Sequence, residues 1–182
     1  MRKKEKRALL FIALIPPKPL RGRIAELKFA FAQKYESRHA LNAPPHITLV
    51  PPFMADSLEV EQLVRDLEGL AGKEHEFELM ICDYGAFKPR VIYLDVQEHE
   101  KAGSLRQKLL SRVMPERENI RGKLHITLAT RDLSKAMFHR AWKDSRNLSF
   151  SESFHVDRFY LLKHDGKNWQ MYHEFTFKKG AS

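Results

Sequence analysis

The tetrapeptide His-Ile-Thr-Leu occurs twice in this chain, at residues 46–49 and again at residues 125–128. Each copy lies in a short apolar run rich in residues that favour β-strands. Side chains point alternately to the two faces of a strand, so the His and the Thr of each copy share one face while the Ile and the Leu share the other. We therefore expect two strands that bury Ile and Leu and present a histidine and a threonine to one cleft.

A repeated tetrapeptide can arise by chance, but here the predicted elements around it recur in the same order. Each half is expected to contain a helix, a His-x-Thr strand, a second helix and two further strands. The ranges in the first half are a helix over 19–38, the strand 46–50, a helix that begins at Asp56 or Ser57 and ends near Gly72, and strands over 77–82 and 91–96. Those in the second half are a helix over 101–114, a polar loop over 115–123, the strand 124–129, a helix capped by Asp132 or Ser134, and a hairpin of strands 154–163 and 169–177.

Three finer expectations concern the ends and faces of these strands. The strand 46–50 should stop at Pro51, because proline donates no hydrogen bond to a sheet. An additional strand over 9–15 precedes the repeat and has no counterpart in the second half. Alternation along the last strand predicts one shared face for the side chains of Trp169, Met171, Phe175 and Phe177.

No linker, low-complexity segment or block of like charges divides the chain. We therefore interpret residues 1–182 as one domain with two pseudo-symmetric lobes, the first over about 8–98 and the second over about 99–178.

The composition supports a packed globular domain with a basic surface. Hydrophobic residues make up 43% of the chain and charged residues 30%, which is sufficient for a core. The net charge of +9 favours polyanionic partners such as nucleic acid, nucleotides or anionic lipid, although an ordinary solvated basic surface stays open as an explanation. The single cysteine, Cys82, rules out an internal disulfide and a cysteine-based zinc site, and it fits a reducing compartment.

The N-terminus combines a basic segment, residues 2–7, with an apolar run over 8–15. This order is similar to a secretory signal, but the apolar run is short and Pro16 and Pro17 follow it in place of a small-residue cleavage site. We interpret the run as a buried strand. No stretch reaches the length needed to span a bilayer, so we expect a cytoplasmic protein without a membrane partner.

Two histidines and two threonines in one cleft are suited to opening a cyclic phosphodiester. That reaction needs a proton taken from water on one side and a proton given to the leaving oxygen on the other. Imidazoles at His46 and His125 can do both near neutral pH. The hydroxyls of Thr48 and Thr127 lie one pleat, about 6.5–7 Å, along the strand and can hold the phosphoryl oxygens. The competing explanation is structural, since threonine simply favours strands.

Other catalytic classes are poorly supported. Two histidines without a well-placed carboxylate make a weak metal site, and the chain has no His-Glu-x-x-His. It also lacks Gly-x-Ser-x-Gly and a Gly-x-x-x-x-Gly-Lys phosphate loop. We therefore expect neither a metal nor another cofactor. The remaining seven histidines show no paired spacing and are treated as ordinary surface or core residues.

The run Pro-Pro-His-Ile-Thr-Leu-Val-Pro-Pro-Phe over 44–53, taken with the second tetrapeptide, resembles the 2H phosphoesterase superfamily and, within it, the 2'-5' RNA ligase-like branch. The likeness extends from residue 10 to the final aromatic strand, including residues 85–94 and 131–133. It implies an α+β fold with two lobes, each an antiparallel sheet with outer helices, and His-x-Thr strands that face a central cleft. It also implies metal-independent opening of 2',3'-cyclic phosphates, commonly to 2'-phosphates, while some members join or cleave 2'-5' linkages.

By this resemblance His46 and His125 are the acid/base pair, and Thr48 and Thr127 hold the phosphate. Which histidine is the acid stays open, because a symmetric motif carries no information on direction. Further candidates for substrate contacts are Lys123, Arg131 and Arg90 for the phosphates, and Phe53 or Tyr160 for stacking on a base.

The expected partner is RNA or a nucleotide with a cyclic phosphate, and no obligatory protein partner is evident, which favours a monomer. Two alternatives to hydrolysis remain at this point: a non-catalytic protein that binds RNA ends or nucleotides, and a 2'-5' RNA ligase or phosphodiesterase.

Overall fold

The computed structural model describes residues 7–117 and 122–179. The predicted basic segment at residues 2–6 and part of the predicted loop, residues 118–121, lie outside the described residues. The strands are β1 (Ala8–Leu14), β2 (Ile47–Ala55), β3 (Phe77–Phe87), β4 (Val91–Val96), β5 (His125–Ala129), β6 (Ser151–Val156), β7 (Arg158–His164) and β8 (Trp169–Thr176). The α-helices are α1 (Lys18–Tyr35), α2 (Ser57–Ala71), α3 (Glu100–Val113) and α4 (Lys135–Ser145). Short 3-10 turns lie at His39–Asn42 and Pro115–Arg117.

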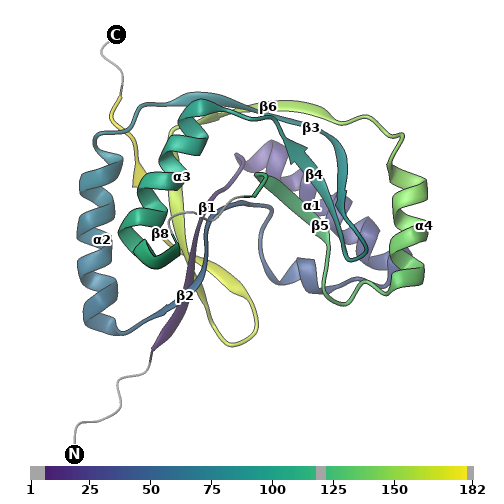
Figure 1. The fold of residues 1–182 in the computed structure, drawn as a ribbon, viewed down its shortest axis with the longest axis horizontal. Coiled ribbons are helices and arrows are strands. Elements are labelled where there is room, and N and C mark those ends of the chain that lie inside the picture. Colours follow the sequence, from purple (N-terminus) through teal and green to yellow (C-terminus); the bar gives the residue numbers. More distant parts are fainter. Residues whose placement is uncertain (1–6, 118–121, 180–182) are drawn as a thin grey trace, which may run out of the picture.

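The strands form two four-stranded antiparallel sheets, in the orders β2-β1-β7-β8 and β5-β4-β3-β6. Helices α2 and α3 pack on the first sheet, through β8 and β2, and helices α1 and α4 pack on the second, through β5 and β4. Figure 1 shows the two sheets in the middle of the molecule with the helices outside them. The expected α+β fold with two antiparallel lobes and outer helices is therefore confirmed.

The repeat begins one strand earlier than the sequence indicated. The order β1–α1–β2–α2 recurs as β4–α3–β5–α4. In both units the first strand pairs with the His-x-Thr strand in the same register, with Ala13 opposite Thr48 and Tyr93 opposite Thr127. The prediction that the first strand has no counterpart was wrong, because β4 had been grouped with the first half.

Each sheet also combines strands from both halves of the chain. The first sheet holds β1 and β2 with β7 and β8, and the second holds β3 and β4 with β5 and β6. The boundary between the lobes is therefore not the point near residue 98 where the sequence repeat had divided the chain.

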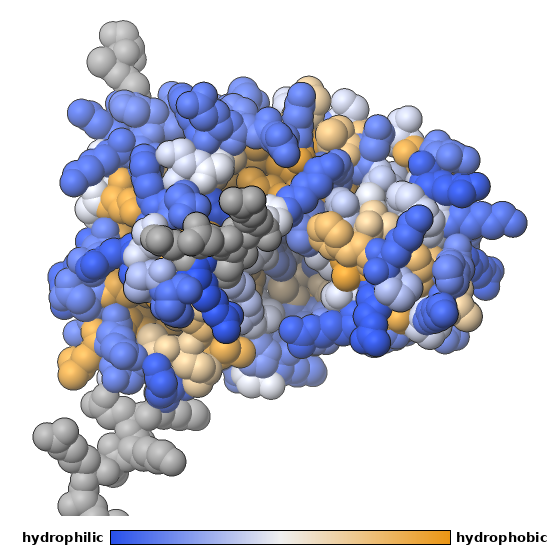
Figure 2. Space-filling view, viewed as in Figure 1, coloured by the Kyte–Doolittle hydropathy of each residue, from blue (hydrophilic) through white to orange (hydrophobic). Residues whose placement is uncertain are grey.

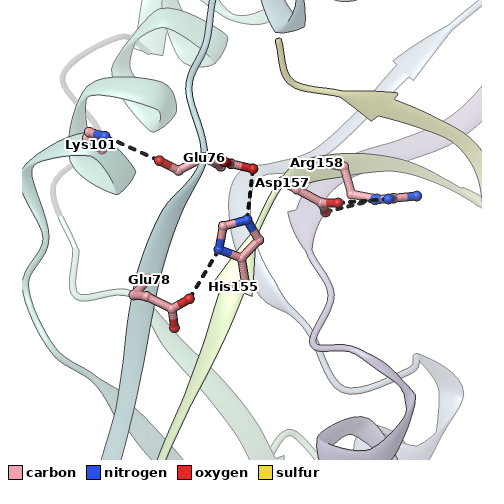
Figure 3. A network of polar contacts seen from close by, with 6 residues as sticks. All are labelled: Glu76, Glu78, Lys101, His155, Asp157 and Arg158. Atoms are coloured by element: carbon pink, nitrogen blue, oxygen red, sulfur yellow. Dashed lines mark hydrogen bonds and ion pairs between the residues drawn. The ribbon is translucent and has the colours of Figure 1, made fainter. Parts of the chain in front are cut away.

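The predicted strand over 154–163 is two strands in different sheets. Strand β6 ends at Val156 and pairs with β3, whereas β7 begins at Arg158 and pairs with β1. The chain crosses between the sheets at Asp157, whose carboxylate binds the neighbouring guanidinium of Arg158 through two contacts of 2.8 and 2.9 Å. Figure 3 shows this pair beside His155, which lies between the carboxylates of Glu76 and Glu78.

The predicted end of β2 and the predicted shared face of β8 were also wrong, because both depend on how the strand pairs with its neighbour. Strand β2 continues through Pro51 and Pro52 to Ala55, because it is an edge strand and its register against β1 shifts there. In β8 a bulge between His173 and Met171 reverses the alternation. Met171 is consequently half exposed, and Trp169 packs against the separate cluster that contains Phe11 and Leu162, whereas Phe175 and Phe177 belong to the main core.

The buried face of each His-x-Thr strand is as predicted. Ile47, Leu49, Ile126 and Leu128 have no exposed surface and belong to the main core. Asp56 caps α2 in a reciprocal capping box with Glu59, and Ser134 caps α4. Within the described residues, no helix has the length and apolar character needed to cross a membrane.

Candidate active site

The two His-x-Thr strands are edge strands of different sheets and contact one another. A cleft of about 420 Å³ lies at this junction, lined by His46 and Thr48 from the first motif and by Thr127 from the second. His125 is not among the lining residues, but its charge acts on His46. The space-filling view shows the surface hollowed between the two lobes, with both hydrophilic and hydrophobic side chains bordering the hollow (Figure 2).

Both histidines are held by the same local hydrogen bond. The Nδ1 of His46 lies 2.7 Å from the carbonyl oxygen of Pro44, and the Nδ1 of His125 lies 2.8 Å from that of Lys123. A carbonyl oxygen only accepts, so Nδ1 carries the proton in the neutral ring and Nε2 keeps its lone pair. Each imidazole is therefore oriented with Nε2 free to exchange a proton.

Aromatic rings contact both imidazoles. The centroid of His46 lies 4.8 Å from that of Phe11, and His125 lies 5.0 Å from both Phe87 and Tyr93. This burial lowers the pKa of His46 to about 4. The hydrogen bond to the Pro44 carbonyl opposes the fall.

The surroundings of His125 differ in charge from those of His46. Burial also lowers the pKa of His125, the positive charge of Arg106 lowers it further, and the Lys123 carbonyl and the carboxylate of Asp95 raise it. Asp95 stands opposite His125 across the β4–β5 pair and binds the ammonium of Lys123. The charged groups acting on the pKa of His46 are the cations Lys28 and His125. The two histidines are thus symmetric in hydrogen bonding and asymmetric in charge.

Lys28 is the lining residue that the sequence analysis missed most clearly. It is 3% exposed, lines the cleft, and donates from Nζ to the carbonyl oxygen of Ala43 at 2.7 Å. Burial lowers its pKa to about 8. The sequence contained a signal of this burial, because Lys28 takes the apolar position between Ile24 and Phe31 on the buried stripe of α1.

Arg131, a predicted phosphate contact, lines the cleft at a turn where its backbone is left-handed with φ of 53°. The neighbouring carboxylate of Asp132 accepts hydrogen bonds from the Ser37 hydroxyl at 2.8 Å and from the backbone N–H groups of Arg38 and His39 at 2.7 and 2.8 Å. These bonds join the turn after β5 to the segment after α1 at the rim of the cleft.

The other four predicted substrate contacts do not line the cleft. Lys123 pairs with Asp95, and Arg90 is exposed in the turn between β3 and β4. Phe53 borders a separate hollow beside α2, and Tyr160 borders another beside Arg158. None of the four is among the residues that line the cleft.

An aromatic wall of the cleft, next to His46, was not predicted. Phe11 and Trp169 meet edge to face at 4.6 Å, and His164 meets Trp169 at 4.9 Å. All three line the cleft. Residues far apart in sequence form this wall, so only the pairing of β1 with β7 and of β7 with β8 could have indicated it.

Within the described part of the chain, no group of three or more His, Cys, Asp or Glu side chains is placed to hold a metal ion. The chemistry that the cleft can support with its own side chains is proton transfer by imidazole and hydrogen bonding by hydroxyl groups.

Residues 16–168 match the family model of the 2'-5' RNA ligase superfamily. A protein of Geobacillus sp. strain WCH70, named as a candidate phosphoesterase, is 32% identical over 169 residues, which cover 90% of this chain and 93% of the relative. A similarly named protein of Bacillus cytotoxicus is 28% identical, and the match covers 94% of this chain and 98% of that relative. Crystal structures of E. coli LigT with 3'-AMP and of a Thermus thermophilus protein share the fold, with TM-scores of 0.66 and 0.65. The LigT match is 21% identical and covers 94% of this chain and 99% of LigT. The Thermus match is 18% identical and covers 95% of this chain and all of the other chain.

Proposed function

The chain belongs to the 2'-5' RNA ligase superfamily, and we propose that it is a metal-independent phosphoesterase that opens 2',3'-cyclic phosphates of RNA ends or nucleotides. The observation that carries this proposal is the matched pair of His46 and His125, each with Nδ1 bound to a carbonyl oxygen and Nε2 left free. Thr48 and Thr127, which line the same cleft, supply the hydroxyl donors.

In the proposed reaction one imidazole takes a proton from water as the water oxygen bonds to phosphorus. The bond from phosphorus to one ribose oxygen breaks, and the second imidazole gives its proton to that oxygen. The product is a phosphomonoester, and the two histidines have exchanged protonation states. General acid–base catalysis of this kind contributes about 10²–10⁴-fold for each group.

We assign the base to His46 and the acid to His125. The neutral form of His46 is favoured by burial and by the nearby charge of Lys28. His125 stands opposite the carboxylate of Asp95, which favours its imidazolium form. A bound phosphate anion also stabilises the imidazolium, so His125 can carry the proton in the complex with substrate.

The rest of the cleft accounts for substrate binding in this proposal. Thr48 and Thr127 donate hydrogen bonds to the phosphoryl oxygens, and Arg131 adds positive charge. The aromatic wall of Phe11 and Trp169 takes the nucleobase, in place of the earlier candidates Phe53 and Tyr160. Structures of the similar E. coli LigT hold 3'-AMP, NADP+ and ATP, which supports a nucleotide-sized ligand.

The test is incubation with the four 2',3'-cyclic nucleotides, with and without EDTA, and separation of the 2'- and 3'-phosphate products. We expect turnover that EDTA leaves unchanged. Binding of a cyclic-phosphate RNA end without any product would favour the non-catalytic alternative, and loss of turnover in EDTA would favour a metal enzyme. Joining of RNA ends through 2'-5' bonds would identify a ligase.

A further inference from the structure

Two cations, one from each of the equivalent helices α1 and α3, donate a hydrogen bond to the backbone segment that precedes a His-x-Thr histidine. From α1, the ammonium of Lys28 donates to the carbonyl oxygen of Ala43 at 2.7 Å. From α3, the guanidinium of Arg106 donates to the carbonyl oxygen of Gly122. Each acceptor stands three residues before its histidine, and α1 and α3 occupy the same place in the repeated unit.

Each cation therefore holds the segment that orients the imidazole. Ala43 immediately precedes Pro44, whose carbonyl oxygen binds Nδ1 of His46. Gly122 immediately precedes Lys123, whose carbonyl oxygen binds Nδ1 of His125. A shift of either segment would move the carbonyl group that sets the ring orientation.

The two side chains are poorly explained by stability alone. Among the described residues no carboxylate pairs with Lys28 or Arg106, and the buried Nε of Arg106 has no hydrogen-bond partner. Burial penalises both cations and lowers the pKa of each. Lys28 is buried and Arg106 is partly buried. A cation withdrawn from water without a counter-ion costs free energy that an apolar side chain of similar size would not, most of all at Lys28, so a functional role is indicated.

We propose that Lys28 and Arg106 are matched positioning residues, each of which fixes the segment before one catalytic histidine and places a positive charge close to that imidazole. This inference rests on the proposed function, because it assigns roles relative to the two-histidine reaction. It extends that function from the four motif residues to a second pair contributed by the helices.

The electrostatic part has a defined direction at each histidine. Lys28 from α1 and His125 from β5 both disfavour a proton on His46. Arg106 from α3 disfavours a proton on His125, and Asp95 from β4, itself bound to Lys123, favours one. The imidazoles of His39 and His164 and the cation Arg131 also border the cleft and are unchanged in the variants below. Removal of one cation should therefore act mainly on its own histidine.

The test uses Lys28→Met and Arg106→Met, which keep much of the side-chain volume and remove the charge and the hydrogen bond. Imidazole titrations of the free protein by NMR provide a readout that needs no turnover. We expect Lys28→Met to raise the pKa of His46 with little change at His125. We expect Arg106→Met to raise the pKa of His125 with little change at His46. kcat/KM for a cyclic nucleotide should fall about tenfold or more in each, because the ring orientation is also loosened.

Matched controls come from the same helices. Lys34→Met on α1 and Arg112→Met on α3 remove exposed cations that pair with Asp144 and Asp66, and both should leave the titrations and kcat/KM unchanged. The swaps Lys28→Arg and Arg106→Lys keep the charge and should recover most of the activity.

Unshifted titrations in both methionine variants would overturn the inference, as would equal shifts in the control variants. If a methionine variant fails to fold, Lys28→Gln or Arg106→Gln, which keeps an N–H donor, is titrated instead with the same expectation. If the wild type shows no turnover, the proposed function fails, whereas the titrations still decide whether the two cations act on the two histidines.

Discussion

The Nδ1 of His46 lies 2.7 Å from the carbonyl oxygen of Pro44, and the equivalent bond at His125 is 2.8 Å long. Since Pro44 comes from the turn that leads into β2, the orientation of the ring is set by the backbone beside it. The same relationship at both sites explains how a repeated tetrapeptide gives two imidazoles in the same tautomer. The difference between the sites then comes from their charged neighbours.

The threonine hydroxyls should contribute through hydrogen bonds to phosphate. Thr48→Val and Thr127→Val keep the shape and strand preference but remove the donor. Each should lower kcat/KM for a cyclic nucleotide about 10-fold, which corresponds to one hydrogen bond to a charged group. Thr176→Val, at an exposed position of β8, is the control and should have no effect. Unchanged kinetics in both cleft variants would exclude this role.

Burial of His46 should make stability depend on pH. Its pKa of about 4 in the folded protein is below the ordinary value of 6.5, so between these values the unfolded chain binds more protons than the native one. The free energy of unfolding should therefore fall as the pH is lowered from 6.5 towards 4. Urea unfolding of the wild type and of His46→Gln across this range measures the effect. Parallel curves for the two proteins would show that His46 is not the group responsible.

The aromatic wall should bind the base of the substrate. Trp169→Ala should raise KM for 2',3'-cyclic AMP about tenfold or more, because stacking of a base on an aromatic ring contributes about 1–3 kcal/mol. Tyr172→Ala removes an exposed aromatic ring of the same strand and serves as the control. A normal KM in Trp169→Ala would place the base elsewhere.

The assignment of acid and base can be tested with a better leaving group. In o-phenylene cyclic phosphate the leaving oxygen is a phenolate, whose conjugate acid has a pKa of about 10, as for tyrosine, so it needs less protonation than an alkoxide. His125→Ala should therefore lose much less activity on this substrate than on a cyclic nucleotide. His46→Ala should lose a similar factor on both. The opposite pattern would exchange the two roles.

Local patterns in the sequence were sufficient to predict the strand faces at the candidate active site. Alternation alone placed Ile47 and Leu49 in the core and Thr48 in the cleft, and the same held for Ile126, Leu128 and Thr127. These positions depend only on the neighbouring residues of one strand. Predictions of this kind need no knowledge of the partner strand.

Features that depend on strand partners were not accessible in this way. The split at Asp157 places β6 and β7 in different sheets, and the bulge beside Met171 depends on the register against β7. Lys28 was overlooked because a lysine on an apolar stripe is usually assigned to the surface. Its position on the apolar stripe of α1 indicated burial, and the packing of α1 against β5 shows it.

The central claim is that His46 and His125 act as a pair of proton-transfer groups. The most direct measurement is kcat/KM for hydrolysis of a 2',3'-cyclic nucleotide by His46→Ala, His125→Ala and the control His155→Ala, whose ring lies between Glu76 and Glu78 outside the cleft. We predict that each of the first two variants folds and loses about 10²–10⁴-fold of the activity, while the control keeps it. Folded His46→Ala and His125→Ala proteins with wild-type turnover would contradict the account.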